Sequence, residues 1–411
     1  METDNGKMKK TLDRLFLRIS EGYPDTPFGV DFWDGATNKY GEGEKKFTLK
    51  IKEPRAVTRI MTQGSLGFGE EYMRGAIDVD GDLQALIKLG NSKAYRSLRI
   101  PIVGKIKIIY AFMAARDTVR NARKNIQQHY DIGNDFYKLW LDPSLTYSCA
   151  YFKRPSDTLE QAQQNKYAYL CRKLRLKIGE RLVDIGCGWG GMMFYAAKKY
   201  GVECVGYTLS ENQYEYVVER ITKEKMQGQV KIHLKDYREA EGQFDKFVSI
   251  GMFEHVGKAF YPAFFATVKR LLKPEGLGVL HHIGTTADRP TDPWVTKYIF
   301  PGGWLPTLSV VCAQMNKHDL VFYDIEDLRP HYARTLDSWI KNFESRIGDI
   351  KKALRGAIND EQGVTEFIRM WRLYLNGSSV SFKYGSNRLY QITFSNGPNN
   401  SLPLTRKYIY E

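Results

Sequence analysis

The stretch that decides the fold is Arg181-Leu182-Val183-Asp184-Ile185-Gly186-Cys187-Gly188-Trp189-Gly190-Gly191. An apolar, β-type run ends beside an acidic residue, and glycines then lead into a helical pattern over residues 192–200. Glycines at such a turn let a ligand approach the backbone, where free N–H groups of the helix N-terminus point outward. The pattern therefore predicts the first βα turn of a doubly wound α/β domain that binds a nucleotide-like cofactor.

The loop by itself fits two classes of cofactor. Asp184 before Gly186, Gly188 and Gly190 resembles motif I of the S-adenosylmethionine-dependent methyltransferases. Gly191 also completes the G-x-G-x-x-G pattern of NAD-binding proteins. The next apolar run, residues 202–207, decides between them, because an NAD site needs an acid at the end of this strand and Thr208 stands there. The second strand therefore favours S-adenosylmethionine.

Further strands follow the same order. Thr208 opens a helix start, Thr208-Leu209-Ser210-Glu211-Asn212-Gln213, in which Ser210 is an N-cap residue by type. A third apolar run ends at Lys235-Asp236-Tyr237-Arg238, where methyltransferases hold the adenine amino group. Residues 244–250 read as a fourth strand, and Gly251-Met252-Phe253-Glu254-His255-Val256-Gly257 comes directly after it.

Taken together, these motifs resemble the cyclopropane-fatty-acyl-phospholipid synthases. Four further segments match that family in the same order: 129–137, 145–152, 281–284 and 374–377. The resemblance as a whole covers the chain from about Gly64 to Phe394. The resemblance implies a mainly parallel, seven-stranded, Rossmann-like sheet with helices on both faces, preceded by a small α+β domain. It also implies methylene transfer from S-adenosylmethionine to a cis double bond in phospholipid acyl chains, with an anionic membrane surface as partner, a location at the inner face of the membrane, and a homodimer as an option.

Residue by residue, the resemblance supplies two sets of site residues. The expected cofactor contacts are Tyr147, Ser148, Asp184, Gly186, Gly188, Gly190, Thr208, Leu209, Gln213, Asp236 and Tyr237. The expected catalytic set holds a bicarbonate ion that removes a proton from the transferred methyl group: Cys149, Glu254, His281, Ile283 through its backbone, and Tyr332. Tyr137 is a candidate pocket wall. In this scheme Glu254 orients the bicarbonate hydroxyl and strengthens it as a base.

Each catalytic candidate also has a plain structural interpretation. Glu254 alone would be a solvated surface acid, His281 a core histidine and Cys149 a small buried apolar residue. The adjacent His281 and His282 suggest a metal site, but no third ligand follows at zinc-type spacing, so no metal is predicted. Many relatives carry a cysteine at the place of Ser378, and its absence here argues against covalent catalysis.

Other functions remain open. The same alkene chemistry could end in a hydride shift and give a methyl-branched or methylene product. A non-catalytic lipid-binding protein could retain this fold, and small-molecule methylation is a more distant option. A nucleic-acid methyltransferase would suit the net charge of +14, but no motif for base amino groups and no RNA- or DNA-binding pattern is found, so nucleic acid is not an expected partner.

The 411 residues divide into three expected parts: a small domain at 1–86, a basic amphipathic linker at 87–127 and the catalytic domain with its acyl pocket at 128–411. In the first, residues 47–52 alternate like a strand, and Gly64–Glu70 reads as a glycine-rich structural turn. Segments 294–304 and 328–371 are expected to build the acyl pocket. Five sparse cysteines suit reduced thiols in a cytoplasm.

The positive excess is concentrated around the linker. Residues 83–127 hold one acid, Asp117, against ten bases: Lys88, Lys93, Arg96, Arg99, Lys105, Lys107, Arg116, Arg120, Arg123 and Lys124. Apolar residues alternate with these charges, which suits either contact with an anionic bilayer or a solvated helical linker. The uncharged run 298–316 is broken by prolines and glycines and is not predicted to span a membrane.

Overall fold

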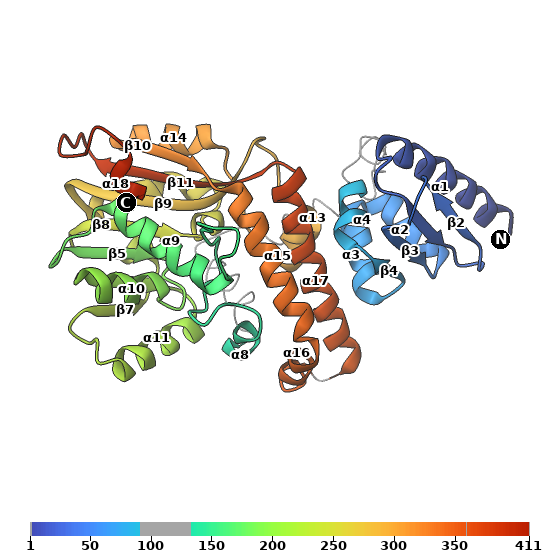
Figure 1. Cartoon of the computed structure of the whole chain (residues 1–411), viewed down its shortest axis with the longest axis horizontal. Helices are drawn as coiled ribbons and strands as arrows, with labels where there is room; N and C mark the ends of the chain where they lie inside the picture. Colours follow the sequence, from blue (N-terminus) through green and yellow to red (C-terminus); the bar gives the residue numbers. More distant parts are fainter. Residues whose placement is uncertain (1, 91–132, 359, 411) are drawn as a thin grey trace. The chain divides into compact units, whose positions relative to one another are not determined.

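The computed structural model describes residues 2–90, 133–358 and 360–410, whose contacts form two compact units (Figure 1). Unit 1 takes its described residues from Met1–Arg116, Asp292–Pro301 and Arg355–Gly385. Unit 2 takes its described residues from Asp117–Thr291, Gly302–Leu354 and Ser386–Glu411. Most of the basic linker predicted at 87–127 lies outside the described residues.

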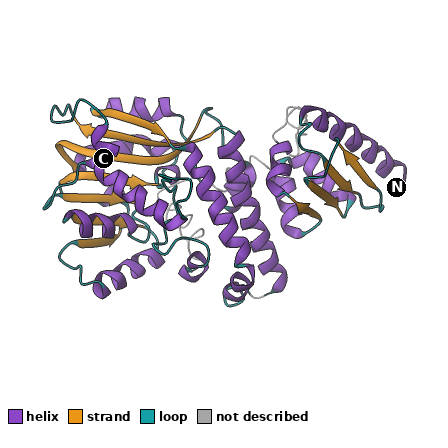
Figure 2. Cartoon of the chain, in the orientation of Figure 1, coloured by secondary structure: helices purple, strands orange, loops and turns teal. Residues whose placement is uncertain are grey.

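Unit 1 contains a four-stranded sheet with the order β2-β1-β3-β4. Strands are drawn in orange in Figure 2. Its strands are β1 Phe28–Asp31, β2 Thr37–Tyr40, β3 Phe47–Ile51 and β4 Ile77–Gly81. Its helices are α1 Glu2–Gly22, α2 Pro54–Gln63, α3 Ser65–Arg74, α4 Leu83–Gly90, α13 Pro293–Tyr298 and α17 Glu361–Tyr384. The strand predicted at residues 47–52 is confirmed, since Phe47, Leu49 and Ile51 alternate as buried positions of β3.

The turn predicted at Gly64–Glu70 is wrong, because α3 begins at Ser65 and runs through this segment. The glycines serve close helix packing instead. A Cβ on Gly67 would lie 2.2 Å from the carbonyl oxygen of Arg59 in α2, and a Cβ on Gly69 would lie 2.2 Å from the ring of Trp294 in α13. Glycine composition alone therefore misled the interpretation, since small residues also mark close contacts between helices.

Two later segments of the chain, Asp292–Pro301 and Arg355–Gly385, group with unit 1, whereas the domain prediction placed them in the catalytic domain. In α17, Arg369 lies over the ring of Tyr72 and donates to the carbonyl oxygens of Tyr72 and Ile77 and, at 3.2 Å, to Asp78. In α13, Lys297 and Tyr298 both donate to Glu70. The sequence could not predict this grouping, because each contact joins residues more than 200 positions apart.

We expect Arg369→Met to lower the free energy of unfolding by about 2–4 kcal/mol, because two carbonyl groups and a carboxylate lose their donor at once. Chemical denaturation followed by circular dichroism measures the loss. Arg346→Met is the matched control, since Arg346 is exposed and its one side-chain partner among the described residues is Asp349, three residues along the chain. That substitution should change stability by less than about 0.5 kcal/mol. Equal effects of the two variants would contradict the role given to Arg369.

Unit 2 is built on a seven-stranded sheet with the order β10-β11-β9-β8-β5-β6-β7. Its strands are β5 Arg181–Ile185, β6 Glu203–Thr208, β7 Val230–Leu234, β8 Phe244–Ile250, β9 Leu272–Thr285, β10 Leu320–Asp327 and β11 Asn387–Asn396. Five neighbouring strands of the sheet, β9, β8, β5, β6 and β7, pair in parallel. At one edge, β11 pairs antiparallel with β9, and β10 pairs antiparallel with β11. The predicted fold, mainly parallel and seven-stranded, is confirmed.

Helices cover both faces of this sheet. The described helices of unit 2 are α8 Asn134–Lys138, α9 Leu159–Leu174, α10 Gly191–Tyr200, α11 Glu211–Lys223, α12 Tyr261–Leu271, α14 Leu308–Lys317, α15 Arg329–Ser345, α16 Ile347–Leu354 and α18 Lys407–Tyr410. Neighbouring residues of β5 enter different cores, Leu182 with α9, α10 and α11, and Val183 with α12 and α14. This alternation explains the continuous apolar runs, because a strand covered on both faces needs no polar positions.

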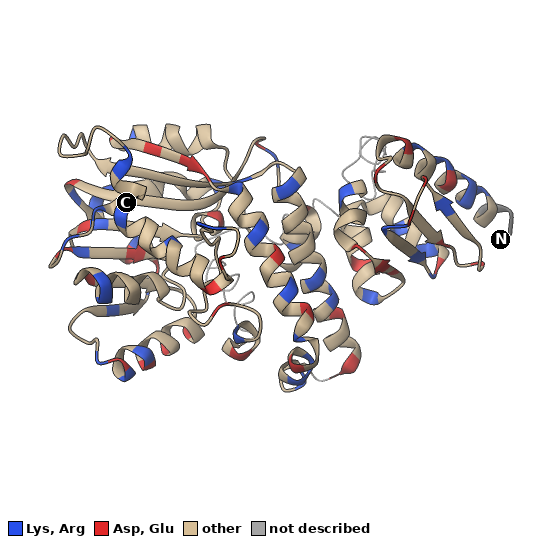
Figure 3. Ribbon diagram, in the orientation of Figure 1, with Lys and Arg blue, Asp and Glu red and all other residues tan. Residues whose placement is uncertain are grey.

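None of the described helices is both long enough and apolar enough to cross a membrane. Charges of both signs lie along α15 and along α17 (Figure 3). The positive excess noted in the sequence is therefore not gathered on these two long helices.

Candidate active site

The glycine loop joins the end of β5 to the start of α10, as the sequence predicted. Gly186, Gly188 and Gly190 all have positive φ, at 78°, 55° and 78°. The N–H groups of Gly186 and Cys187 both donate to the carbonyl oxygen of Tyr207 in β6, which fixes the loop on the neighbouring strand. A Cβ on Gly186 would lie 2.4 Å from the Met252 side chain. Backbone conformation and close approach therefore both require glycine here.

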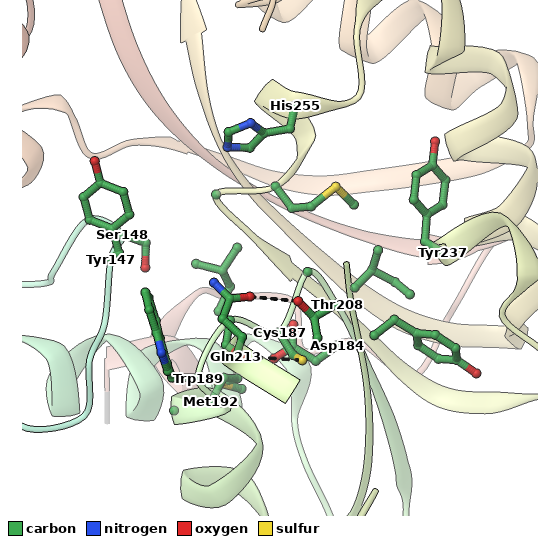
Figure 4. A pocket seen from close by; sticks show the side chains of 18 of the residues that line it. Tyr147, Ser148, Asp184, Cys187, Trp189, Met192, Thr208, Gln213, Tyr237 and His255 are labelled. Carbon is green, nitrogen blue, oxygen red and sulfur yellow. Dashed lines mark hydrogen bonds between the residues drawn. The ribbon is translucent and has the colours of Figure 1, made fainter. Parts of the chain in front are cut away.

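A pocket opens above this loop, at the carboxyl ends of the parallel strands (Figure 4). Ten of the eleven predicted cofactor contacts line it: Tyr147, Ser148, Asp184, Gly186, Gly188, Thr208, Leu209, Gln213, Asp236 and Tyr237. Gly190 does not line it, whereas Gly191 does. The position matches the rule that ligands of open α/β sheets bind beyond the carboxyl ends of the strands.

Side chains after β6 are held by local hydrogen bonds. The Thr208 hydroxyl donates to the Gln213 side-chain oxygen at 2.8 Å, the contact drawn in Figure 4. Ser210 caps α11, because its side-chain oxygen accepts from the Gln213 N–H. After β7, both oxygens of Asp236 accept from the Arg238 guanidinium at 2.6–2.7 Å. The adenine contact expected of Asp236 therefore depends on acceptor capacity that this ion pair leaves free.

Two buried charged residues lie at the pocket, Asp184 and Lys166. Burial raises the pKa of the Asp184 carboxyl, and the nearby Lys166 opposes this rise. Burial lowers the pKa of the Lys166 ammonium, and Asp142, Cys149 and Asp184 oppose that change. Asp184 Oδ1 is buried and has no hydrogen-bond partner among the described residues. An unpartnered carboxylate oxygen facing a pocket is a site for a donor on a ligand.

Several residues that line the pocket were not among the predicted contacts, and three of them carry polar or aromatic side chains suited to a ligand: Lys166, Trp189 and His255. Trp189 lies within the glycine motif and His255 directly follows Glu254, so both positions could have been found from neighbouring residues that were predicted. Lys166 lies on α9, which precedes the first motif strand. The only available signal was a lysine in a helix whose other residues are largely apolar or aromatic on that face.

The predicted catalytic residues gather beside this pocket without lining it. Glu254, in the short helical turn Phe253–His255 after β8, is buried, and its Oε1 accepts from the Ile283 N–H. Its Oε2 has no partner among the described residues, and burial raises the pKa of this carboxyl to about 7. Ile283 thus positions Glu254 through the backbone N–H that was expected to hold the anion.

His281 lies on β9, where its carbonyl oxygen accepts from the Gly251 N–H at 2.8 Å. Its Nδ1 lies 3.0 Å from the amide nitrogen of Gln391, which is a donor, so the ring proton belongs on Nε2. Burial holds the pKa of His281 well below its usual range, and its Nε2 has no partner in the described part of the chain. The ring is therefore neutral and presents one N–H donor.

Cys149 and Tyr332 are linked through α15. Thr335, one turn after Tyr332, accepts from the N–H of Ala150, and burial raises the pKa of the Cys149 thiol. Tyr332 packs edge-on against Trp339, which packs against Tyr147 with ring centroids 5.2 Å apart. Cys149 therefore stays an uncharged thiol, and Tyr332 is connected by ring contacts to a pocket-lining residue.

Comparisons with known proteins identify the family. The family described as Mycolic acid cyclopropane synthetase matches residues 117–392, and a domain of unknown function matches residues 15–101. The chain is 38% identical to the cyclopropane-fatty-acyl-phospholipid synthase of Escherichia coli, over 89% of this chain and 92% of that protein. It is 34% identical to a probable fatty acid methyltransferase of Pseudomonas putida, over 93% and 96% of the two chains.

A solved structure agrees with the fold. A mycolic acid cyclopropane synthase complexed with SAH and CTAB is 34% identical, with a TM-score of 0.61, over 66% of this chain and 98% of that one. SAH, S-adenosylhomocysteine, is what remains of S-adenosylmethionine after its methyl group has been transferred. The chain therefore belongs to the mycolic acid cyclopropane synthetase family and is an S-adenosylmethionine-dependent methyltransferase.

Proposed function

We propose that the protein transfers a methylene carbon from S-adenosylmethionine to the cis double bond of unsaturated phospholipid acyl chains, forming a cyclopropane ring. One observation carries the proposal. Glu254 Oε2 and His281 Nε2 are both buried and unpartnered in the described part of the chain, and both residues adjoin segments that line the cofactor pocket. Buried polar atoms without partners mark a site for a polar ligand.

These residues fit a bicarbonate ion. His281 offers an N–H donor, Glu254 an acceptor for a hydroxyl, and Tyr332 a phenol. Bicarbonate would supply the base that takes a proton from the transferred methyl group. Glu254 makes that base stronger when its Oε2 accepts a hydrogen bond from the bicarbonate hydroxyl. Cys149 contributes bulk and exclusion of water, since its thiol remains protonated.

Aromatic rings supply the second requirement of the reaction. Methylation of an alkene leaves positive charge on the acyl chain, and aromatic faces stabilise such a charge in a dry site. Tyr137 lies between two pocket-lining residues, with ring centroids 5.1 Å from Trp189 and 5.8 Å from Tyr147. Trp339 continues this row from Tyr147 to Tyr332. These contacting rings support the proposal of an aromatic wall that extends from the cofactor pocket to the proposed bicarbonate site.

Phospholipid as acceptor is supported by the similarity to the Escherichia coli enzyme, which extends through both units of this chain. The basic stretch 83–127 supports an anionic membrane surface as partner and a position at the cytoplasmic face of the membrane. A homodimer stays a prediction from the resemblance.

A second outcome is supported by the name of the Pseudomonas putida relative, a fatty acid methyltransferase. The same cation could undergo a hydride shift and give a methyl-branched or methylene chain. The two outcomes share every residue described above and differ only in how the cation is quenched.

Vesicles of anionic, cis-monounsaturated phospholipid test the proposal, with cofactor and with bicarbonate removed and then restored. Cyclopropane acyl chains should form with bicarbonate, and their rate should fall at least tenfold without it. Turnover that ignores bicarbonate would contradict the assigned base. Turnover on free fatty acid but not on vesicles would contradict the assigned acceptor.

A further inference from the structure

The helix α9 carries a row of buried polar side chains that hold one wall of the cofactor pocket. Gln163, Lys166 and Tyr167 lie three and four residues apart, on one face of the helix. Gln163 donates from its amide nitrogen to the carbonyl oxygens of Ser148, at 2.9 Å, and Thr146. Tyr167 shares a hydrogen bond with the Thr146 hydroxyl at 2.5 Å. The row therefore fixes the segment 146–148, which lines the pocket.

Lys166 and Tyr167 of this row both line the pocket, and Lys166 is the basic one. Its side chain is fully buried and lines the pocket, and its Nζ lies 2.8 Å from the Ser148 hydroxyl oxygen. An ammonium group has donors only, so Ser148 must accept this hydrogen bond. The hydroxyl proton of Ser148 is then left to point elsewhere, and no acceptor for it occurs among the described residues.

Of the two acidic residues near Lys166, Asp142 has hydrogen-bond partners for both oxygens, whereas one oxygen of Asp184 has none among the described residues. Asp142, one of its acidic neighbours, already accepts from the N–H groups of Ser144 and Thr146. Asp184, the other, has an unpartnered Oδ1. This part of the pocket therefore presents the Lys166 amino group with an oriented hydroxyl donor, and close to it the Asp184 carboxyl with an unpartnered oxygen. Burial shifts the pKa of both groups to about 7, and opposite charges on a ligand would favour the ionised form of each. Such a pair is complementary to a zwitterion.

The amino-acid part of S-adenosylmethionine is such a zwitterion, with a carboxylate and an ammonium group on one carbon. In Figure 4, Ser148 lies on one side of the pocket and Tyr237, from the segment expected to contact adenine, on the other. The cofactor can span these two ends. We propose that Lys166 and Ser148 form the subsite for the cofactor carboxylate, with Lys166 as a positioning residue that aims the Ser148 proton at it.

The inference rests on the cofactor part of the proposed function and needs no acyl acceptor, so binding alone tests it. Isothermal titration calorimetry compares S-adenosylhomocysteine with its decarboxylated analogue, which keeps the adenine, the sulfur and the ammonium group. For Lys166→Met we expect a roughly 10- to 100-fold loss of affinity for S-adenosylhomocysteine, the range of a charge-assisted hydrogen bond, and an unchanged affinity for the analogue.

Ser148→Ala is the second variant, and it leaves the lysine in place. It should show the same selective loss, and the double variant should lose no more than about threefold beyond Lys166→Met, because the two residues act on one group. Lys173→Met is the matched control. Lys173 is another fully buried lysine of α9, but it donates to Glu326 and does not line the pocket. It should cost stability without changing the ratio of the two affinities.

Equal losses for both ligands in Lys166→Met and Ser148→Ala would overturn the proposal, as would no loss for either. A higher bicarbonate requirement with unchanged S-adenosylhomocysteine affinity would assign the subsite to bicarbonate and would also overturn it. If the wild-type protein binds the decarboxylated analogue as tightly as S-adenosylhomocysteine, no carboxylate subsite exists. Failure of the wild-type protein to bind either ligand would overturn the proposed function together with this inference.

Discussion

Glu254→Gln is expected to lower product formation roughly 100- to 10,000-fold, the usual contribution of a positioned acid or base, while making the folded protein more stable at pH 8. The loss of activity follows from the role of Oε2 as acceptor for the bicarbonate hydroxyl. The gain in stability follows from burial, which raises the pKa of this carboxyl from 4.5 to about 7. The same group is therefore unfavourable for the fold and required for the reaction.

The direction of the pH dependence can be derived from this shift. The unfolded carboxyl ionises near pH 4.5 and the folded one near pH 7, so between these values the folded state holds the extra proton. The stability of the wild-type protein therefore falls as the pH rises through this window, by about 3 kcal/mol. An amide avoids that cost, although its unpartnered NH₂ group costs about 1 kcal/mol. Thermal unfolding should thus give Glu254→Gln a free energy of unfolding about 2 kcal/mol higher than that of the wild-type protein at pH 8, and no such advantage at pH 4.5.

Glu71→Gln is the matched control for a buried carboxylate. Glu71 lies in α3 of unit 1 and is paired with both Arg59 and Arg74, so loss of its charge should destabilise the fold by about 3–5 kcal/mol. Cofactor affinity and product formation per folded molecule should be unchanged. A Glu254→Gln variant that retains full activity, or that loses stability at pH 8 as Glu71→Gln does, would contradict the role assigned to Glu254.

The second large effect is expected at the glycine loop. Gly186→Ala should weaken S-adenosylhomocysteine binding at least about 100-fold, because a Cβ there would lie 2.4 Å from Met252, which lines the pocket. The backbone cannot move away easily, since the Gly186 N–H is bonded to Tyr207 at 2.9 Å. Calorimetric titration measures the loss.

Gly179→Ala separates strain from crowding. Gly179 has a φ of 79°, against 78° for Gly186, but a Cβ there would meet nothing within 4 Å, and the residue lies away from the pocket. Its substitution should cost about 1 kcal/mol of stability and leave the affinity unchanged. If both alanine variants bind alike, the loop is not the cradle of the cofactor.

The sequence was most informative where one strand is followed by its ligand-binding turn. The strands β5, β6 and β8 begin and end within about one residue of their predicted bounds, because continuous apolar runs stop at glycines or at Thr208. Six predicted residues that line the pocket lie in or shortly after β5 and β6: Asp184, Gly186, Gly188, Thr208, Leu209 and Gln213. Tyr147 and Ser148, which also line it, were supplied by the family resemblance alone. The prediction named Gly190, but Gly191 lines the pocket instead. Gly190 turns the chain before α10, and Gly191 is the first residue of that helix.

What the sequence could not predict depends on contacts between distant segments. Lys166 became part of the pocket only when α9 packed beside residues 146–148. The grouping of α13 and α17 with the N-terminal strands required Arg369 to meet Tyr72, almost 300 residues away. The Ile283 N–H was expected to hold an anion and instead holds Glu254, because β9 brings that N–H to the carboxylate. Local sequence patterns do not reveal contacts between residues that are far apart in the chain.

The most direct test of the account uses cofactor with a trideuteromethyl group, anionic vesicles of cis-monounsaturated phospholipid, and mass spectrometry of the released acyl chains. Ring closure loses one hydrogen of the transferred methyl group to the base, here a deuteron, so the account predicts a product that keeps two deuteriums and resists hydrogenation. A branched chain that keeps three deuteriums would contradict ring formation and show that the cation is quenched by a hydride shift instead.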